Sequence, residues 1–211
     1  GSGDASVKVW DLSRGKPGFS LEGPASSVSA VAFSPGGGRI LAGYKDGSAR
    51  IWDAATRAPL LTIEGVDAPL SAVAFSPDGT RILTGSGDGV ARLYDAGNGA
   101  LLQTLRGHAG TVASVAFSPD GRRILTGSWD RTARIWEAVS GEVLQTLAGH
   151  TAYISAVAFS PGGDRAVTAS WDRTAIVWDL AGEKPLLTLE GHDGTVASVA
   201  FSPDGRRILT G

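Results

Sequence analysis

Residues 107–148 read GHAGTVASVAFSPDGRRILTGSWDRTARIWEAVSGEVLQTLA, and this stretch decides the fold because the whole chain repeats it. The pentapeptide Val-Ala-Phe-Ser-Pro occurs five times, with a spacing of 42 residues each time and no insertion. Its phenylalanines are Phe33, Phe75, Phe117, Phe159 and Phe201. A strict period in this range indicates one supersecondary unit per repeat, which needs its neighbours to bury its faces. We therefore expect a single repeat domain over residues 1–211.

Within one unit the residue pattern predicts four strands joined by tight turns. Residues 111–117 are apolar or small, and they end at Ser-Pro-Asp-Gly in 118–121, which favours a turn. Further strands are predicted at 123–128, 132–136 and 142–147. Because the first strand carries no charge, both of its faces should be covered, which fits four-stranded antiparallel blades packed around an axis. A flat solenoid is the alternative, but it normally shows atypical capping repeats, which are absent from this sequence.

The repeats resemble the WD-repeat β-propeller family over essentially the whole chain. The Trp-Asp signature of that family is present with one Tyr and one Glu as departures, at Trp10-Asp11, Trp52-Asp53, Tyr94-Asp95, Trp136-Glu137 and Trp178-Asp179. The family's Gly-His pair stands at Gly107-His108, Gly149-His150 and Gly191-His192. The two earlier sites have lost the histidine and read Gly23-Pro24 and Gly65-Val66. The resemblance implies an all-β protein, a β-propeller of four-stranded antiparallel blades.

The resemblance also implies a hydrogen-bonded network in each blade, made of the histidine, a Ser or Thr that ends the second strand, the turn aspartate and the tryptophan. By position, two full sets are His108, Ser128, Asp130, Trp136 and His150, Ser170, Asp172, Trp178. A third set would join residues from both ends of the chain, namely His192, Ser2, Asp4 and Trp10. We interpret these sets as structural.

A serine hydrolase is the competing interpretation of the same residues, because a nucleophilic serine needs a histidine oriented by a carboxylate. The residue types recur at the repeat interval with a tryptophan attached, which a single active site would not require. The three histidines also lie in different blades and lack a second ligand at a suitable spacing for a metal ion. We therefore predict no enzyme activity, no cofactor and no metal site.

The phase of the repeat places both ends of the chain within one blade. Complete blades are expected at 23–64, 65–106, 107–148 and 149–190, and a split blade is expected from 191–211 together with 1–22. Because unpaired sheet edges are a liability, we expect the halves to pair, giving five blades from one chain or ten from two. Pairing within one chain costs only loop-closure entropy, which favours the five-blade ring.

Large side chains on an otherwise regular frame predict the partner-binding surface. By the resemblance, the residue before the turn aspartate and the start of the first strand lie on the upper face, where Trp129, Tyr153 and Trp171 would form an aromatic cluster. Tyr44 and Lys45 form a second patch. The alternative interpretation is that the two tryptophans belong to an identical copied segment, at 128–133 and 170–175, and only cover the top of the blade without binding a partner.

The function predicted from these features is a non-catalytic scaffold that binds a protein or peptide at its upper rim. The alternative is a propeller segment, natural or engineered, whose main property is self-assembly into a closed ring, including a homodimer formed by blade closure between chains. A net charge of −2 without a basic stripe argues against nucleic acid as a partner. No apolar run approaches the roughly 18 residues needed to span a membrane, and the absence of cysteine is compatible with the cytoplasm.

Overall fold

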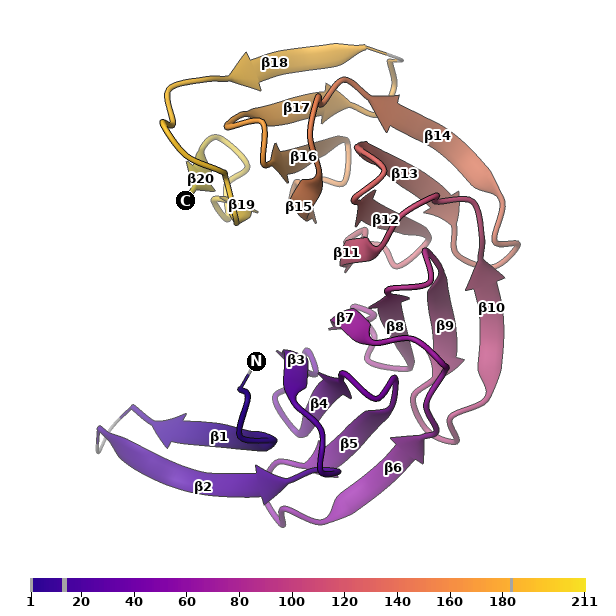
Figure 1. Ribbon diagram of the computed structural model, residues 1–211, viewed down its shortest axis with the longest axis vertical. Helices are drawn as coiled ribbons and strands as arrows, with labels where there is room; N and C mark the ends of the chain where they lie inside the picture. Colours follow the sequence, from indigo (N-terminus) through magenta and orange to yellow (C-terminus); the bar gives the residue numbers. More distant parts are fainter. Residues whose placement is uncertain (1, 13–14, 183) are drawn as a thin grey trace.

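The computed structural model describes residues 2–12, 15–182 and 184–211, and it is all-β (Figure 1). The described residues form twenty strands, arranged as four sheets of four strands and two sheets of two. Every sheet joins strands that follow one another along the chain, so each repeat is an antiparallel meander. No helix that could cross a membrane is found in these residues.

The four-stranded sheets are the complete blades. The first contains β3 (Val28–Phe33), β4 (Arg39–Tyr44), β5 (Ala49–Asp53) and β6 (Pro59–Ile63). The second contains β7 (Leu70–Phe75), β8 (Arg81–Ser86), β9 (Ala91–Asp95) and β10 (Leu101–Leu105). The third contains β11 (Val112–Phe117), β12 (Arg123–Ser128), β13 (Thr132–Glu137) and β14 (Val143–Ala148). The fourth contains β15 (Ile154–Phe159), β16 (Arg165–Ser170), β17 (Ala175–Asp179) and β18 (Pro185–Leu189). The arrangement is that of a β-propeller whose ring is not closed (Figure 1).

Burial along each blade follows from the residues of its strands. The second strand is covered on both faces, since β12 is buried from Ile124 to Ser128. It contains Gly127, where an added Cβ would lie 2.6 Å from side-chain atoms of both Ile154 and Val157 in the next blade. The small residue therefore lets neighbouring blades approach closely. The outermost strand β14 is mostly exposed, as its mixture of polar and apolar residues suggests.

Neighbouring blades are joined by apolar packing and by a repeated arginine contact. Leu125 and Ile135 of one blade share a buried cluster with Ile154 and Trp178 of the next. The guanidinium of Arg123 lies 5.7 Å from the centre of the Phe159 ring, and Arg39 and Arg81 make the same contact with Phe75 and Phe117 at 5.2 and 5.6 Å. Each blade is therefore oriented by the one before it.

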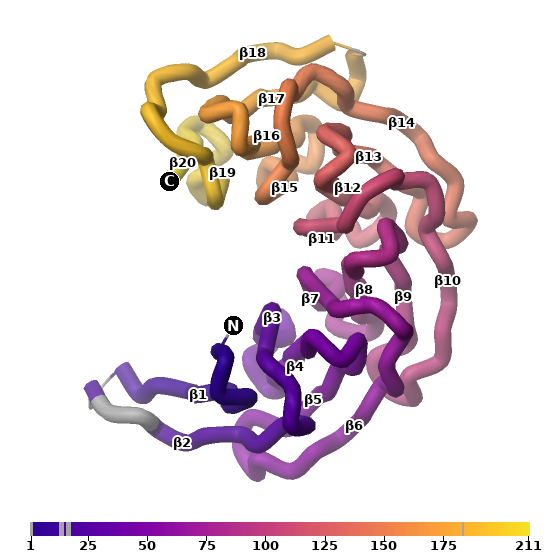
Figure 2. The backbone as a smooth tube through the Cα atoms, in the orientation of Figure 1, coloured from indigo at the N-terminus to yellow at the C-terminus, as the bar shows by residue number. Residues whose placement is uncertain are grey.

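The two ends of the chain form separate half-blades at opposite ends of an open arc (Figure 2). One contains β1 (Ser6–Asp11) and β2 (Lys16–Glu22), and the other contains β19 (Val199–Phe201) and β20 (Ile208–Thr210). The expected pairing of these halves within one chain is wrong for this structure. Five blades at the roughly 51° of a seven-blade ring cover only about 255°, so the ends do not meet unless the blades pack at a wider angle.

Candidate functional site

A chain of hydrogen bonds runs through the interior of the third blade. The Trp136 indole Nε1–H donates to Thr126 Oγ1 over 2.9 Å, and Thr126 Oγ1 lies 2.7 Å from His108 Nε2. His108 Nδ1 lies 2.8 Å from Asp130 Oδ2. With Nδ1 protonated toward the carboxylate, Nε2 accepts from the threonine hydroxyl, so every polar atom in this chain has a partner. The fourth blade repeats the arrangement with Trp178, Thr168, His150 and Asp172.

The hydroxyl in this network belongs to Thr126, which corrects the expectation that Ser128 would supply it. Ser128 ends the strand, and its hydroxyl is used by the adjoining turn, donating to Gly110 O over 2.9 Å and accepting from the Asp130 N–H over 3.1 Å. Thr126 lies two residues earlier on the same face of the strand, level with the imidazole. The same correction applies in the fourth blade, where Thr168 takes the role expected for Ser170.

The charges of the network are set by burial and hydrogen bonding. Burial raises the pKa of the Asp130 carboxyl, but hydrogen bonds from Thr132, His108 and the Ala109 N–H outweigh it and lower the pKa to about 2. Burial lowers the pKa of His108, against the raising effect of Asp130. At neutral pH the network therefore contains a neutral imidazole and an ionised carboxylate. Because Thr126 and Ser128 are both fully buried, neither hydroxyl is placed to attack a substrate.

The third expected set is divided between the two half-blades. His192 Nε2 lies 2.7 Å from Thr210 Oγ1 at one end of the arc. At the other end, Ser2 donates to Asp4 over 2.5 Å, and this bond, with those from Ser6, lowers the pKa of Asp4 to about 2. The structure does not bring His192 to Asp4 or Trp10. Among residues 2–12, 15–182 and 184–211, no group of three His, Asp or Glu side chains is arranged to hold a metal ion.

Tyr44 lies in the core, which corrects its expected place on the partner-binding surface. Its blade has Pro24 in the position of the histidine and Ala42 in that of the threonine, so the space of the missing network is open to a larger side chain. Tyr44 fills that space, since a Cβ on Gly23 would lie 2.2 Å from its hydroxyl oxygen. Its hydroxyl has no hydrogen-bond partner in the described residues, and burial raises the pKa of Tyr44 to about 12.

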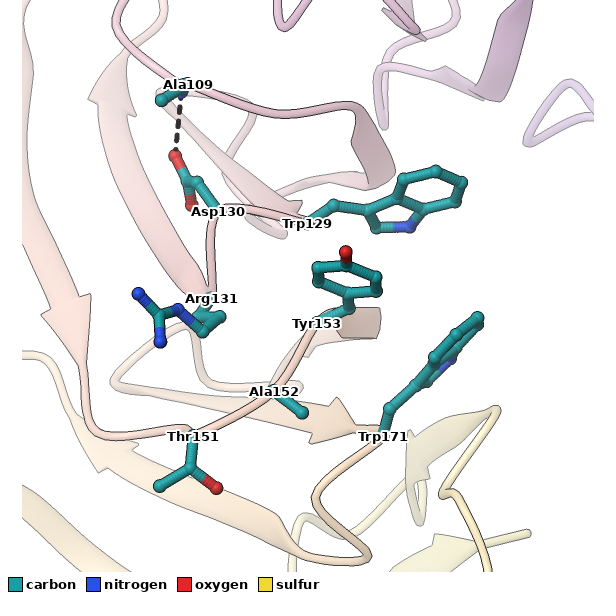
Figure 3. Close-up of a pocket in the computed structure, with 8 residues that line it drawn as sticks. All are labelled: Ala109, Trp129, Asp130, Arg131, Thr151, Ala152, Tyr153 and Trp171. Carbon is teal, nitrogen blue, oxygen red and sulfur yellow. Dashed lines mark hydrogen bonds between the residues drawn. The ribbon is translucent and has the colours of Figure 1, made fainter.

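The upper rim consists of the turns between the second and third strands of each blade and the residues at the start of each first strand. Trp129, Tyr153 and Trp171 come together on it (Figure 3), and each of these residues is nearly half exposed to solvent. The rings of Trp129 and Tyr153 stack with centroids 5.5 Å apart and an angle of 17°. The ring centroid of Trp171 lies 5.4 Å from that of Tyr153 and 6.4 Å from that of Trp129. We call these three residues the aromatic cluster.

The main chain holds the cluster in place. The Trp129 N–H donates to Thr111 O and the Trp171 N–H donates to Tyr153 O, each over 3.0 Å. A pocket of about 660 Å³ opens beside the three rings and is lined also by Arg131, which points away from them (Figure 3). The carboxylate of Asp130 borders this pocket but is already bound to His108.

A second pocket, of about 550 Å³, adjoins the cluster and shares Trp129 with it. Lys45 lies at this pocket, as does Gly87, which holds the same repeat position as Lys45 and Trp129. Gly87 is not among the binding residues predicted from the sequence, which were chosen for their large side chains. A sequence signal for the pocket exists, because a glycine between Lys45 and Trp129 at the same repeat position leaves a space where its neighbours have long side chains.

The family model described as WD domain, G-beta repeat matches the chain at residues 15–53, 57–95, 99–137, 141–179 and 183–211. No curated protein matches the chain. The family model covers most of the sequence, and its matches at 15–53, 57–95, 99–137 and 141–179 each contain the outermost strand of one blade followed by the first three strands of the next. The chain therefore belongs to the WD-repeat family.

Proposed function

We propose that this chain is a non-catalytic scaffold that binds a protein or peptide partner at its upper rim. WD-repeat domains are, as a kind, protein-interaction scaffolds. The observation that carries the proposal here is the aromatic cluster, in which three half-exposed rings contact one another beside a pocket. Tyrosine and tryptophan in such positions supply much of the binding energy of protein interfaces.

The cluster is suited to binding because its residues are already ordered. The main-chain N–H of each tryptophan donates a hydrogen bond to the residue just before a first strand, and each ring contacts its neighbours. A partner that covers them therefore loses little additional side-chain entropy on association. The rings also form a contiguous apolar surface, and surfaces of this kind on a folded domain mark interaction sites.

Replacing Trp129, Tyr153 and Trp171 together by alanine is expected to reduce partner capture from lysate at least tenfold, because each buried interface aromatic contributes on the order of 2 kcal/mol. Bound proteins would be quantified for wild type, the triple variant and a control. The control replaces the exposed apolar residues Leu101, Leu102 and Leu144 of the outermost strands β10 and β14. The control should capture partners as wild type does, and undiminished capture by the triple variant would reject the rim as the binding site.

A second candidate function, self-assembly through the half-blades, is favoured by exposed apolar residues on half-blade strand β1 and on the adjoining strand β3 of the first complete blade. Trp10 is 58% exposed, whereas its equivalent Trp136 is 1% exposed. Phe33 is 57% exposed, although Phe75, Phe117 and Phe159 are each covered by an arginine of the preceding blade. These residues lack the neighbours that the repeat provides elsewhere.

The opposite half-blade carries the complementary groups. In the third blade Ile124 pairs with Trp136, so the repeat interval places Ile208 of β20 opposite Trp10 of β1. The same interval places Arg207 over Phe33 and brings His192 and Thr210 to Asp4. We propose that β20 of one copy pairs with β1 of a second copy, which would complete the split blade and its network.

Light scattering over a range of concentrations tests the assembly directly. The 211-residue chain is expected to rise from its chain mass of 21.6 kDa toward at least twice that mass. Trp10→Asp should hold it at the single-chain mass, because a charge would be buried in the completed blade without a partner. Leu102→Asp, on an outer strand, is the control and should leave assembly unchanged. A single-chain mass at every concentration would refute assembly.

A further inference from the structure

The second pocket lies at the upper rim where the first three complete blades meet. Val28 and Leu70, the first residues of β3 and β7, are almost fully buried and form its floor. Pro69 and Trp129 line its sides, and Lys45 completes the lining. With a volume of about 550 Å³, it has room for an apolar side chain together with part of the attached main chain.

Gly87 is the reason that this space is open. Lys45 and Trp129 occupy its repeat position in the two neighbouring blades, and both have long side chains. A Cβ added to Gly87 would meet Pro69 Cδ at 3.5 Å, which is ordinary van der Waals contact. A larger side chain at this position is therefore compatible with the local backbone, and it would extend into the pocket.

The main-chain donors of the residues at the rim position are already used. The N–H groups of Lys45, Gly87 and Trp129 donate to the carbonyls of Ser27, Pro69 and Thr111, over 2.9 to 3.0 Å. These three N–H groups are therefore not available for the main-chain hydrogen bonds that hold an added peptide strand in place. Recognition at this pocket must come from apolar contact and from charge.

The charge available to a ligand is that of Lys45. Its side chain is exposed and makes no ion pair with the described parts of the chain, 2–12, 15–182 and 184–211. The neighbouring carboxylates belong to their own turns, because Asp46 accepts from Ser48 and Asp88 accepts from Arg92. An apolar space beside an unpaired ammonium group favours a ligand with an apolar body and a carboxylate.

We propose that this pocket binds the C-terminal residue of a partner protein, with its aliphatic side chain on Val28 and Leu70 and its carboxylate at Lys45. One Cα carries both groups in a C-terminal residue, so a single residue satisfies the apolar floor and the cation together. An internal acidic residue would add a second side chain and two peptide groups, and the N–H groups of Lys45, Gly87 and Trp129 are already bonded and cannot bind them. The inference rests on the proposed rim function and adds the chemistry of the partner.

The test uses N-acetyl-leucine as the probe and N-acetyl-leucinamide as its uncharged match, titrated into the ¹⁵N-labelled 211-residue chain. N-acetyl-leucine is expected to shift the amide resonances of Lys45, Leu70 and Gly87 in a saturable manner. The amide should bind about fivefold more weakly, because it loses a charge-assisted contact at a partly exposed site. Equal affinities for the two probes would overturn the proposal.

Two variants and a control make the test specific. Gly87→Trp should abolish binding by filling the pocket. Lys45→Gln should reduce the affinity for N-acetyl-leucine to that for N-acetyl-leucinamide. Lys8→Gln alters an exposed lysine on β1 and should bind N-acetyl-leucine as wild type does. Circular dichroism checks that Gly87→Trp is folded, and Lys45→Gln decides the outcome if it is not.

The remaining outcomes separate this inference from the proposed function. If acetyl-aspartyl-leucinamide binds as tightly as N-acetyl-leucine, the site recognises an internal acidic residue and the C-terminal assignment is wrong. If wild type binds neither probe while the aromatic cluster still captures a partner, this inference fails alone. If N-acetyl-leucine binds but alanine substitution of the cluster leaves capture unchanged, the pocket stands and the cluster assignment fails.

Discussion

Thr126→Val is expected to lower the free energy of unfolding by about 3 kcal/mol. Valine keeps the shape of threonine but removes the oxygen that lies between the Trp136 indole N–H and His108 Nε2. Both of these side chains are buried, so water does not replace the lost partner. Each unsatisfied buried polar group costs roughly 1 to 3 kcal/mol.

Urea unfolding followed by far-ultraviolet circular dichroism measures this loss, and Ser128→Ala is the matched control. Ser128 is also fully buried, but its bonds to Gly110 O and the Asp130 N–H belong to the turn, so we expect a loss of about 1 kcal/mol. The difference between the two variants assigns the network hydroxyl. A larger loss for Ser128→Ala than for Thr126→Val would contradict the assignment.

Gly47→Ala is expected to cost about 3 kcal/mol, although arginine occupies the same repeat position in two other blades. Gly47 has a φ of +85°, and a Cβ there would lie 2.0 Å from Val66 O and 2.8 Å from Ala68 O. The substitution therefore combines left-handed strain with a collision against main-chain atoms. Arg131 and Arg173 adopt φ values of 73° and 72°, so that conformation is accessible to residues with a Cβ.

Gly37→Ala separates the two contributions at Gly47. Gly37 has a φ of +70°, and an added Cβ would meet no atom within 4 Å. The substitution should therefore lower the free energy of unfolding only by the left-handed strain, about 1 to 2 kcal/mol. Urea unfolding of both variants gives the collision term by difference. Equal losses would show that residues 66–68 move aside, and the close packing of that loop over the turn would then contribute nothing.

Much of the blade could be predicted from the sequence because the evidence for it is local. Strand ends follow from Ser-Pro-Asp-Gly turns, and the buried second strand follows from an apolar run such as Arg-Ile-Leu-Thr-Gly-Ser. The choice between Thr126 and Ser128 was beyond this evidence, because side chains two residues apart lie on the same face of a strand. Only the depth at which the His108 imidazole lies in the blade decides which of the two hydroxyls it contacts.

Tyr44 and the open ring show where local patterns end. Tyr44 stands beside Lys45 in the sequence, but its direction depends on the space left by the small Ala42 and by Pro24, which lies 20 residues earlier in the chain. The angle between blades is the summed result of many side-chain contacts, such as those of Arg123 and Gly127 with the next blade. A repeat length contains no information on that angle, so ring closure did not follow from it.

The main-chain hydrogen bond at the rim position has a consequence for how such a surface changes over generations. Lys45, Gly87 and Trp129 all make it, with donor–acceptor distances of 2.9 to 3.0 Å, so it does not depend on the side chain present. A mutation at this position therefore changes the side chain presented at the rim while leaving this hydrogen bond in place. Under the proposed rim function, selection can act there on recognition alone, blade by blade, and a duplicated repeat brings a new rim residue that is free to diverge.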